Sequence, residues 1–199
     1  MNKHIDFYKK ISVKLLSDSA KAAGLDPNNP PDLQIFKKII NKRRRILEVG
    51  CGTGRLGKFL IDEYEYVGVD TNINYINEFL NVIKTSKKFL LLNMDFIDFS
   101  SGELFDVILF PWTVIGDFSE YDQEIVINKA LELLNNDGII ILDNPAVNTV
   151  YNSHCGYEPV RFYYDEWVNK FIKLKINKFY KIEYRTNTGR QREITIIEK

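Results

Sequence analysis

Three glycines stand at alternate positions, Gly50, Gly52 and Gly54, directly after the apolar run 45–49. Glycine is needed where a ligand approaches the backbone too closely for a Cβ atom, or where φ is positive. The loop after the first strand of an open parallel sheet faces the crevice in which ligands bind. The spacing therefore predicts a ligand-binding loop between a strand and a helix, with Cys51 as a small residue that borders the ligand without chemistry of its own.

Glu48 separates two candidate ligands for this loop. Residues 52–57 match the G-x-G-x-x-G pattern of dinucleotide-binding loops, which is a weak signal when it stands alone. An acidic side chain just before the glycines repels a pyrophosphate and attracts a cationic group. S-adenosylmethionine (SAM) carries an ammonium and a sulfonium and has no phosphate. Glu48 therefore favours SAM over a nicotinamide dinucleotide as the cofactor.

Two further acidic residues follow apolar runs. Asp70 can accept hydrogen bonds from both hydroxyls of a ribose, as acids do at the same place in dinucleotide sites; a helix N-cap is its alternative role. Asp95 can accept from an adenine amino group, while Phe96 can cover the ring. Thr71 and Met94 are the neighbouring contacts that we expect to complete this part of the cofactor site.

The elements that position these residues alternate between short apolar runs and helical patterns. Such alternation predicts an α/β fold with a mostly parallel sheet and helices on both faces. Two strand-like runs around a Gly-containing turn at the end of the chain predict an antiparallel hairpin. The predicted strands are 45–49, 66–70, 89–93, 105–110, 138–142, 178–186 and 191–197, and the predicted helices of this part are 55–63, 73–85, 123–134 and 164–173.

The amino-terminal part has helical spacing over 5–23 and 32–42, separated by a loop rich in proline and asparagine. We expect residues 1–43 to form a helical extension that can close over the cofactor as a lid. Residues 44–199 are then one globular sheet domain. The basic run 42–45 is best explained as a charged helix end, where cations complement the helix dipole.

Five segments resemble, in order along the chain, the successive motifs of class I, Rossmann-like, SAM-dependent methyltransferases: residues 48–54, 68–70, 94–95, 105–108 and 134–141. The resemblance covers about residues 44–145. It implies a seven-stranded sheet whose last strand is antiparallel, and S-adenosylhomocysteine (SAH) as the product. It also implies that the glycine loop lies under the methionine portion of SAM, with Asp70 on the ribose and Asp95 near the adenine.

In this family the transferring methyl group lies after the fourth strand. Several enzymes that methylate amino groups of bases or glutamine carry an Asn/Asp-Pro-Pro-aromatic signature there, and residues 110–112 read Phe-Pro-Trp instead. We expect Phe110 beside the cofactor, and His154 or Asp117 to remove a proton from the acceptor. Core packing is the alternative role of Trp112. The expected acceptor contacts are Tyr8, Trp112, Tyr157 and Arg161.

Composition limits the partners. The chain has 27 basic and 27 acidic side chains, so it lacks the basic excess that neutralises phosphates, and we do not expect a nucleic-acid partner. The two cysteines have no metal-ligand spacing, so no metal is expected. The start lacks an apolar signal-peptide core and no run is long enough to span a bilayer, so we expect a cytoplasmic protein.

The sequence thus predicts a methyltransferase that moves a methyl group from SAM to a nitrogen or oxygen atom of a small-molecule acceptor, as a monomer or homodimer. Three alternatives stay open. One is a methyltransferase that acts on RNA or protein, which would use the same cofactor site. Another is a SAM-binding subunit without catalysis, and the third is an NAD(P)-dependent oxidoreductase that uses residues 52–57 as its phosphate loop.

Overall fold

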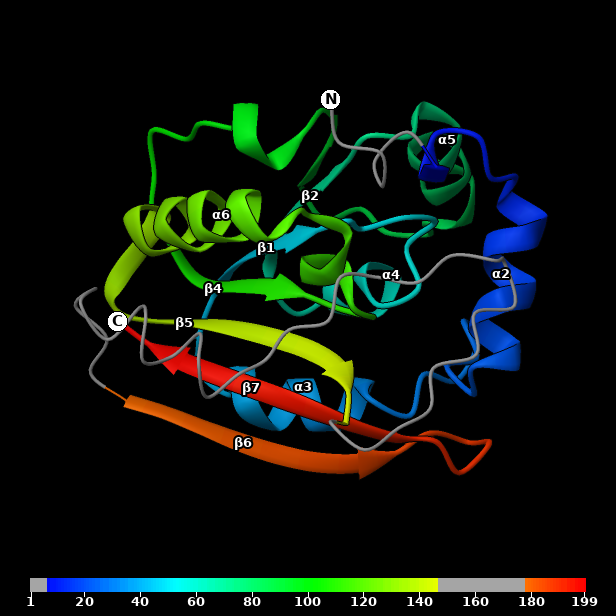
Figure 1. The fold of residues 1–199 in the computed structure, drawn as a ribbon. Coiled ribbons are helices and arrows are strands. Elements are labelled where there is room, and N and C mark those ends of the chain that lie inside the picture. Colours follow the sequence, from blue (N-terminus) through cyan, green and yellow to red (C-terminus); the bar gives the residue numbers. More distant parts are fainter. Residues whose placement is uncertain (1–6, 147–177) are drawn as a thin grey trace.

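A seven-stranded mixed sheet runs through the protein in the order β3-β2-β1-β4-β5-β7-β6 (Figure 1). The computed structural model describes residues 7–146 and 178–199. The first five strands pair in parallel, and β7 is antiparallel to both of its neighbours. The strands are β1 Arg45–Val49, β2 Glu65–Asp70, β3 Phe89–Asn93, β4 Phe105–Phe110, β5 Leu134–Pro145, β6 Lys178–Arg185 and β7 Gln191–Glu198. The predicted parallel sheet with an antiparallel C-terminal hairpin is confirmed.

Helices cover both faces of this sheet. They are α2 Val13–Ala22, α3 Leu33–Ile40, α4 Gly57–Leu60, α5 Ile73–Val82 and α6 Glu120–Leu133, with the 3-10 turns η1 Phe96–Asp98 and η2 Val114–Asp117. Alternate residues along each buried strand point to opposite faces, which creates two apolar cores. One core joins the sheet to α6 and η1, and the other joins it to α3, α4 and α5.

Several helices are shorter than their sequence patterns predict. The pattern over 5–23 is broken at residues 9–12, and α2 begins only at Val13 because Ser12 caps it, with its Oγ accepting from the N–H of Leu15 at 3.2 Å. The predicted helix 55–63 is reduced to α4, since the glycine loop takes up the preceding residues in turns. In the opposite direction, α6 begins three residues earlier than predicted, because Ser119 caps it.

Boundaries elsewhere differ for local reasons. The helix α5 ends at Val82, before Ile83 adopts an extended conformation. The strand β5 begins at Leu134, directly after α6, and a register shift against β4 absorbs the added residues. The predicted helix 164–173 lies outside the described residues.

The amino-terminal residues are fastened to the sheet domain at several points. The N–H of Asn187, in the β6–β7 turn, donates to the carbonyl of Gly24 at 3.0 Å. Gly24 has a φ of 75°, and a Cβ there would lie 2.6 Å from atoms of Thr186 and Thr188. The helix α3 packs into one of the two cores, and α2 lies past the carboxyl ends of β4 and β5 (Figure 1). Among the described helices, none has the length and apolar character to cross a bilayer.

Candidate active site

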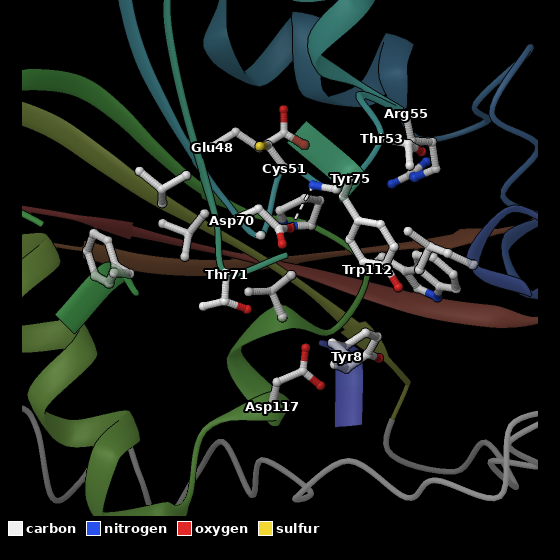
Figure 2. Close-up of a pocket in the computed structure, with 18 of the residues that line it drawn as sticks. Tyr8, Glu48, Cys51, Thr53, Arg55, Asp70, Thr71, Tyr75, Trp112 and Asp117 are labelled. Atoms are coloured by element: carbon white, nitrogen blue, oxygen red, sulfur yellow. Dashed lines mark hydrogen bonds between the residues drawn. The ribbon is translucent and has the colours of Figure 1, made fainter. Parts of the chain in front are cut away.

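A cavity lies at the carboxyl ends of the central parallel strands, where an open α/β sheet binds its ligands (Figure 2). Its floor is the glycine loop after β1. The ends of β2 and β3 supply one wall, the loop after β4 supplies another, and residues of α2 together with Tyr8 cover it. Segments that are far apart in sequence thus meet at one edge of the sheet.

The three glycines of the loop serve three different needs. All have positive φ: 66° at Gly50, 53° at Gly52 and 80° at Gly54. A Cβ on Gly50 would come 2.7 Å from the side chain of Val114, so this glycine allows the post-β4 loop to approach. A Cβ on Gly52 would meet only Leu16, at 3.6 Å, and would project into the cavity space.

Gly54 packs against α5, and its role as a cofactor contact stays a prediction. It does not line the cavity, and a Cβ there would lie 2.2 Å from the ring of Phe79. Its glycine is therefore required by packing between the loop and α5. The small residue Cys51 does border the cavity and is buried, which raises the pKa of its thiol and keeps it neutral.

The carboxylate of Asp70 ties the end of β2 to the glycine loop. One oxygen accepts from the N–H of Gly52 at 2.9 Å and the other accepts from the N–H of Asn72 at 2.8 Å. Burial raises the pKa of Asp70 to about 6, and these backbone donors oppose that rise. The N-cap role is taken instead by Asn72, whose side chain accepts from the N–H of Asn74.

Glu48 lies at the base of the cavity with 1% of its surface exposed. Its carboxylate accepts a hydrogen bond of 2.5 Å from the hydroxyl of Tyr66. Burial raises the pKa of Glu48 to about 7, while the Tyr66 hydrogen bond and the charge of Arg55 act to lower it. The surroundings of Glu48 therefore make its carboxyl group gain or lose its charge near neutral pH.

Met94, Asp95 and Phe96 line the cavity after β3, as expected for a wall beside a ring. Asp95 caps η1, with one oxygen accepting from the N–H of Ile97 at 3.0 Å. The ring of Phe96 stands edge-on to Phe110, at a centroid distance of 5.6 Å. Phe110 is fully buried behind it and does not line the cavity. Phe110 therefore supports Phe96 from behind, and its role as a cofactor contact stays a prediction.

The side expected to hold the acceptor is lined by Tyr8, Trp112, Asp117 and Phe118. Figure 2 shows Asp117 and Tyr8 at the end of the view opposite Glu48, with Thr71 and Asp70 between. These side chains combine aromatic surface with one carboxylate.

Three predicted residues, His154, Tyr157 and Arg161, lie outside the described residues. Within the described part of the chain, no group of three or more His, Cys, Asp or Glu side chains is arranged to hold a metal.

Some cavity residues have no local sequence signal. Arg55 lines the cavity and forms a bidentate ion pair with the buried Asp32, both hydrogen bonds being 2.7 Å long. Tyr75, from α5, lines the cavity and donates to the carbonyl of Ile11 at 2.9 Å. These contacts join segments far apart in sequence, so only the fold reveals them.

Comparison with known proteins agrees with this geometry. Residues 46–138 match a family model described as a methyltransferase domain. No curated protein matches the chain in sequence.

Solved structures with the same fold include three N-methyltransferases. NodS from Bradyrhizobium japonicum WM9 is 15% identical, with a TM-score of 0.66 over 84% of this chain and 92% of NodS. The glycopeptide N-methyltransferase MtfA is 14% identical, with a TM-score of 0.71 over 84% of this chain and 94% of MtfA. The 1,6-didemethyltoxoflavin-N1-methyltransferase of Burkholderia thailandensis is 11% identical, with a TM-score of 0.72 over 99% of this chain and 89% of that enzyme. The chain thus matches a methyltransferase domain over residues 46–138, and its seven-stranded sheet has the same fold as these methyltransferases.

Proposed function

We propose that the cavity binds SAM and that the protein transfers its methyl group to a nitrogen or oxygen atom of a small molecule, with nitrogen favoured. The charge of the cavity carries this proposal. Four carboxylates line it, those of Glu48, Asp70, Asp95 and Asp117. Among the described lining residues Arg55 is the single cation, and Asp32 already pairs with it. Such a lining attracts a cationic cofactor and repels a pyrophosphate.

The residues present fit SAM. Gly52 leaves room for a ligand against the backbone, because a Cβ there would meet only Leu16. In this proposal Asp70 accepts from the ribose hydroxyls, Glu48 attracts the ammonium group and Phe96 covers the adenine, and all three line the cavity. The structures of MtfA with SAM and of the toxoflavin enzyme with SAH carry such ligands on the same fold.

SAM supplies a methyl group on a sulfonium, which is already an activated leaving group. The protein therefore has to orient the acceptor and exclude water, and these two effects can supply most of the acceleration. Trp112 and Phe118 supply apolar surface for this purpose, and Tyr8 covers the cavity. A general base is needed only where the acceptor must lose a proton before or during attack.

An amine nitrogen suits the acceptor side. Aromatic rings and a carboxylate together recognise cationic or basic nitrogen groups. Tyr8, Trp112 and Asp117 provide this combination, and NodS, MtfA and the toxoflavin enzyme each methylate nitrogen. In this role Asp117 would hold the amine by a hydrogen bond and accept the proton that it loses on methylation.

Isothermal titration with SAM and SAH tests the cofactor, with NAD(H) and NADP(H) as competing ligands. We expect micromolar binding of the sulfur nucleosides and a loss of about tenfold or more in Asp70→Ala, because ribose hydrogen bonds to a charged group are lost. Binding of a nicotinamide nucleotide in place of SAH would overturn the proposal.

The acceptor is tested by SAH release from SAM with panels of small amines, alcohols and carboxylic acids. We expect turnover with amines, lowered by about a hundredfold in Asp117→Asn if the carboxylate accepts the proton. SAH binding should stay as in the natural protein, since Asp117 lies on the acceptor side. Turnover confined to alcohols or carboxylic acids would contradict the proposal that the acceptor is an amine.

A further inference from the structure

Two consecutive residues at the acceptor side hold a backbone conformation that side chains disfavour. Trp112 and Thr113, directly after β4, have φ values of 46° and 69°. The left-handed region costs a non-glycine residue about 1–2 kcal/mol, more for a β-branched one. Conformations of this kind persist only where the surroundings over-determine them. The structure therefore has to supply contacts that compensate for this strain.

Asp143, in the neighbouring strand β5, supplies the first of these contacts. Its side chain accepts from the N–H of Trp112 at 2.9 Å, and its carbonyl accepts from the N–H of Thr113 at 2.7 Å. Asp143 has no exposed surface. One buried residue thus binds both left-handed peptide units.

Arg192, from the antiparallel strand β7, completes the arrangement. Its Nε donates to one oxygen of Asp143 at 2.9 Å and its Nη2 to the other at 3.0 Å. The same Nη2 donates to the hydroxyl of Thr113 at 3.0 Å. The hydroxyl of Tyr184 donates to Asp143 at 3.0 Å. The Asp143 charge raises the pKa of Arg192, so the guanidinium stays charged.

A second buried ion pair lies near the first. Asp32 and Arg55 join α3 to the glycine loop. The charge of Asp143 acts on Arg55, and that of Asp32 acts on Arg192.

We propose that Asp143 and Arg192 are positioning residues that fix the acceptor wall of the cavity, by holding Trp112 and Thr113 in their left-handed conformation beside the glycine loop. This inference rests on the proposed function in assigning the Trp112 wall to the acceptor. A buried ion pair is weak evidence for stability, because the desolvation of its charges offsets their attraction. The three hydrogen bonds that join this pair to Trp112 and Thr113 give it a specific structural task.

Tryptophan fluorescence tests the proposal without any acceptor. The chain has two tryptophans, so Trp167→Phe leaves Trp112 as the only reporter. In this background, Asp143→Asn should increase acrylamide quenching of Trp112 by about twofold or more, since a loosened wall opens to solvent. The matched control is Asp32→Asn, which removes the same charge from the other buried pair, at a residue whose side chain forms its hydrogen bonds with Arg55 and not with Trp112 or Thr113. Its quenching should equal that of the background protein.

A second comparison keeps the test decisive if Asp143→Asn fails to fold. Thr113→Val removes the hydroxyl that Arg192 binds and keeps the side-chain shape, whereas Thr113→Ser keeps the hydroxyl. We expect Thr113→Val to raise the quenching of Trp112 and Thr113→Ser to restore it. Equal quenching in Asp143→Asn and Asp32→Asn, or in Thr113→Val and Thr113→Ser, would overturn the inference. The quenching results do not depend on SAH, whereas failure of the background protein to bind SAH would count against the proposed function alone.

Discussion

The hydroxyl of Tyr66 donates a hydrogen bond of 2.5 Å to the carboxylate of Glu48, where neither side chain has more than 2% of its surface exposed. The pair joins β2 to β1 directly beneath the glycine loop. Because Glu48 also lines the cavity, its protonation state links the buried hydrogen bond with Tyr66 to the charge of the ligand site. Two consequences of this coupling can be measured.

The first concerns cofactor affinity. Burial raises the pKa of Glu48 to about 7, and only the ionised form attracts the ammonium of SAH. SAH affinity should therefore fall as the pH is lowered through about 7. Tyr66→Phe should move the midpoint upward, because the hydrogen bond that it removes lowers the Glu48 pKa. Glu48→Gln should abolish this step and leave the smaller one of Asp70, at about 6. Titration calorimetry across the range checks this; a midpoint that Tyr66→Phe leaves in place would contradict it.

The second concerns stability without ligand. The pKa of Glu48 is about 7 in the folded state and 4.5 in a model carboxyl, so the folded state retains its proton while the unfolded chain loses it. The free energy of unfolding should therefore decrease as the pH rises between these values, by roughly 2–3 kcal/mol. Urea denaturation over that interval measures the slope. Glu48→Gln should reduce it, leaving the part due to Asp70, and an equal slope in this variant would argue against Glu48 as the source.

Substitution of two glycines separates ligand contact from packing. Gly52→Ala should weaken SAH binding by about tenfold and cost only about 1–2 kcal/mol of stability, from its positive φ. Gly54→Ala should cost about 3 kcal/mol or more, because its Cβ would overlap the ring of Phe79 in addition to the φ strain. Thermal unfolding and SAH titration distinguish the two.

Gly189→Ala is the matched control for these variants. Gly189 also has a positive φ, of 79°, and a Cβ there would have no neighbour within 4 Å. It therefore measures the conformational cost alone, away from the cavity. Should Gly52→Ala bind SAH as well as Gly189→Ala does, the glycine loop would not be the floor of the ligand site.

The sheet could be predicted from the sequence because buried parallel strands are continuous apolar runs, such as residues 105–110, bounded by glycines and acids. The cavity floor and the carboxylate of Asp70 followed from the same rule, since strand ends meet at one edge of the sheet. Reliance on local spacing also explains why the helix predicted over 5–23 is too long. Apolar residues continue at helical spacing before residue 12, but the helix α2 begins only after its cap, Ser12.

Long-range contacts are what the sequence could not provide. The sequence does not distinguish Gly54 from Gly50 and Gly52, yet Gly54 packs against Phe79, in α5. Phe110 lies at the correct strand end, but its ring packs against Phe96. The pairing of Asp143 with Arg192 joins residues 49 positions apart, through strands β5 and β7 that are adjacent only in the folded sheet. Identifying such partners requires knowledge of strand order and register.

The last prediction concerns the proposed lid. The hydroxyl of Tyr75 donates to the carbonyl of Ile11, and the side chain of Asn72 donates to the carbonyl of Tyr8. Tyr75→Phe removes one of these two hydrogen bonds, worth about 1 kcal/mol, and keeps the buried ring. If residues 7–12 close over the ligand, amide hydrogen exchange in this segment should accelerate and the dissociation rate of SAH should rise by about fivefold, with little change in its association rate.

Tyr66→Phe is the control for that substitution, because it removes an equally buried hydroxyl that contacts Glu48 and no residue of the amino-terminal segment. It should leave hydrogen exchange of residues 7–12 as it is in the natural protein. At a pH well above 7, where Glu48 is ionised in both proteins, its SAH dissociation rate should also change less than that of Tyr75→Phe. A Tyr75→Phe protein with faster exchange in residues 7–12 but an unchanged dissociation rate would show that this segment opens without controlling the ligand, and the lid would have to be sought elsewhere in the chain.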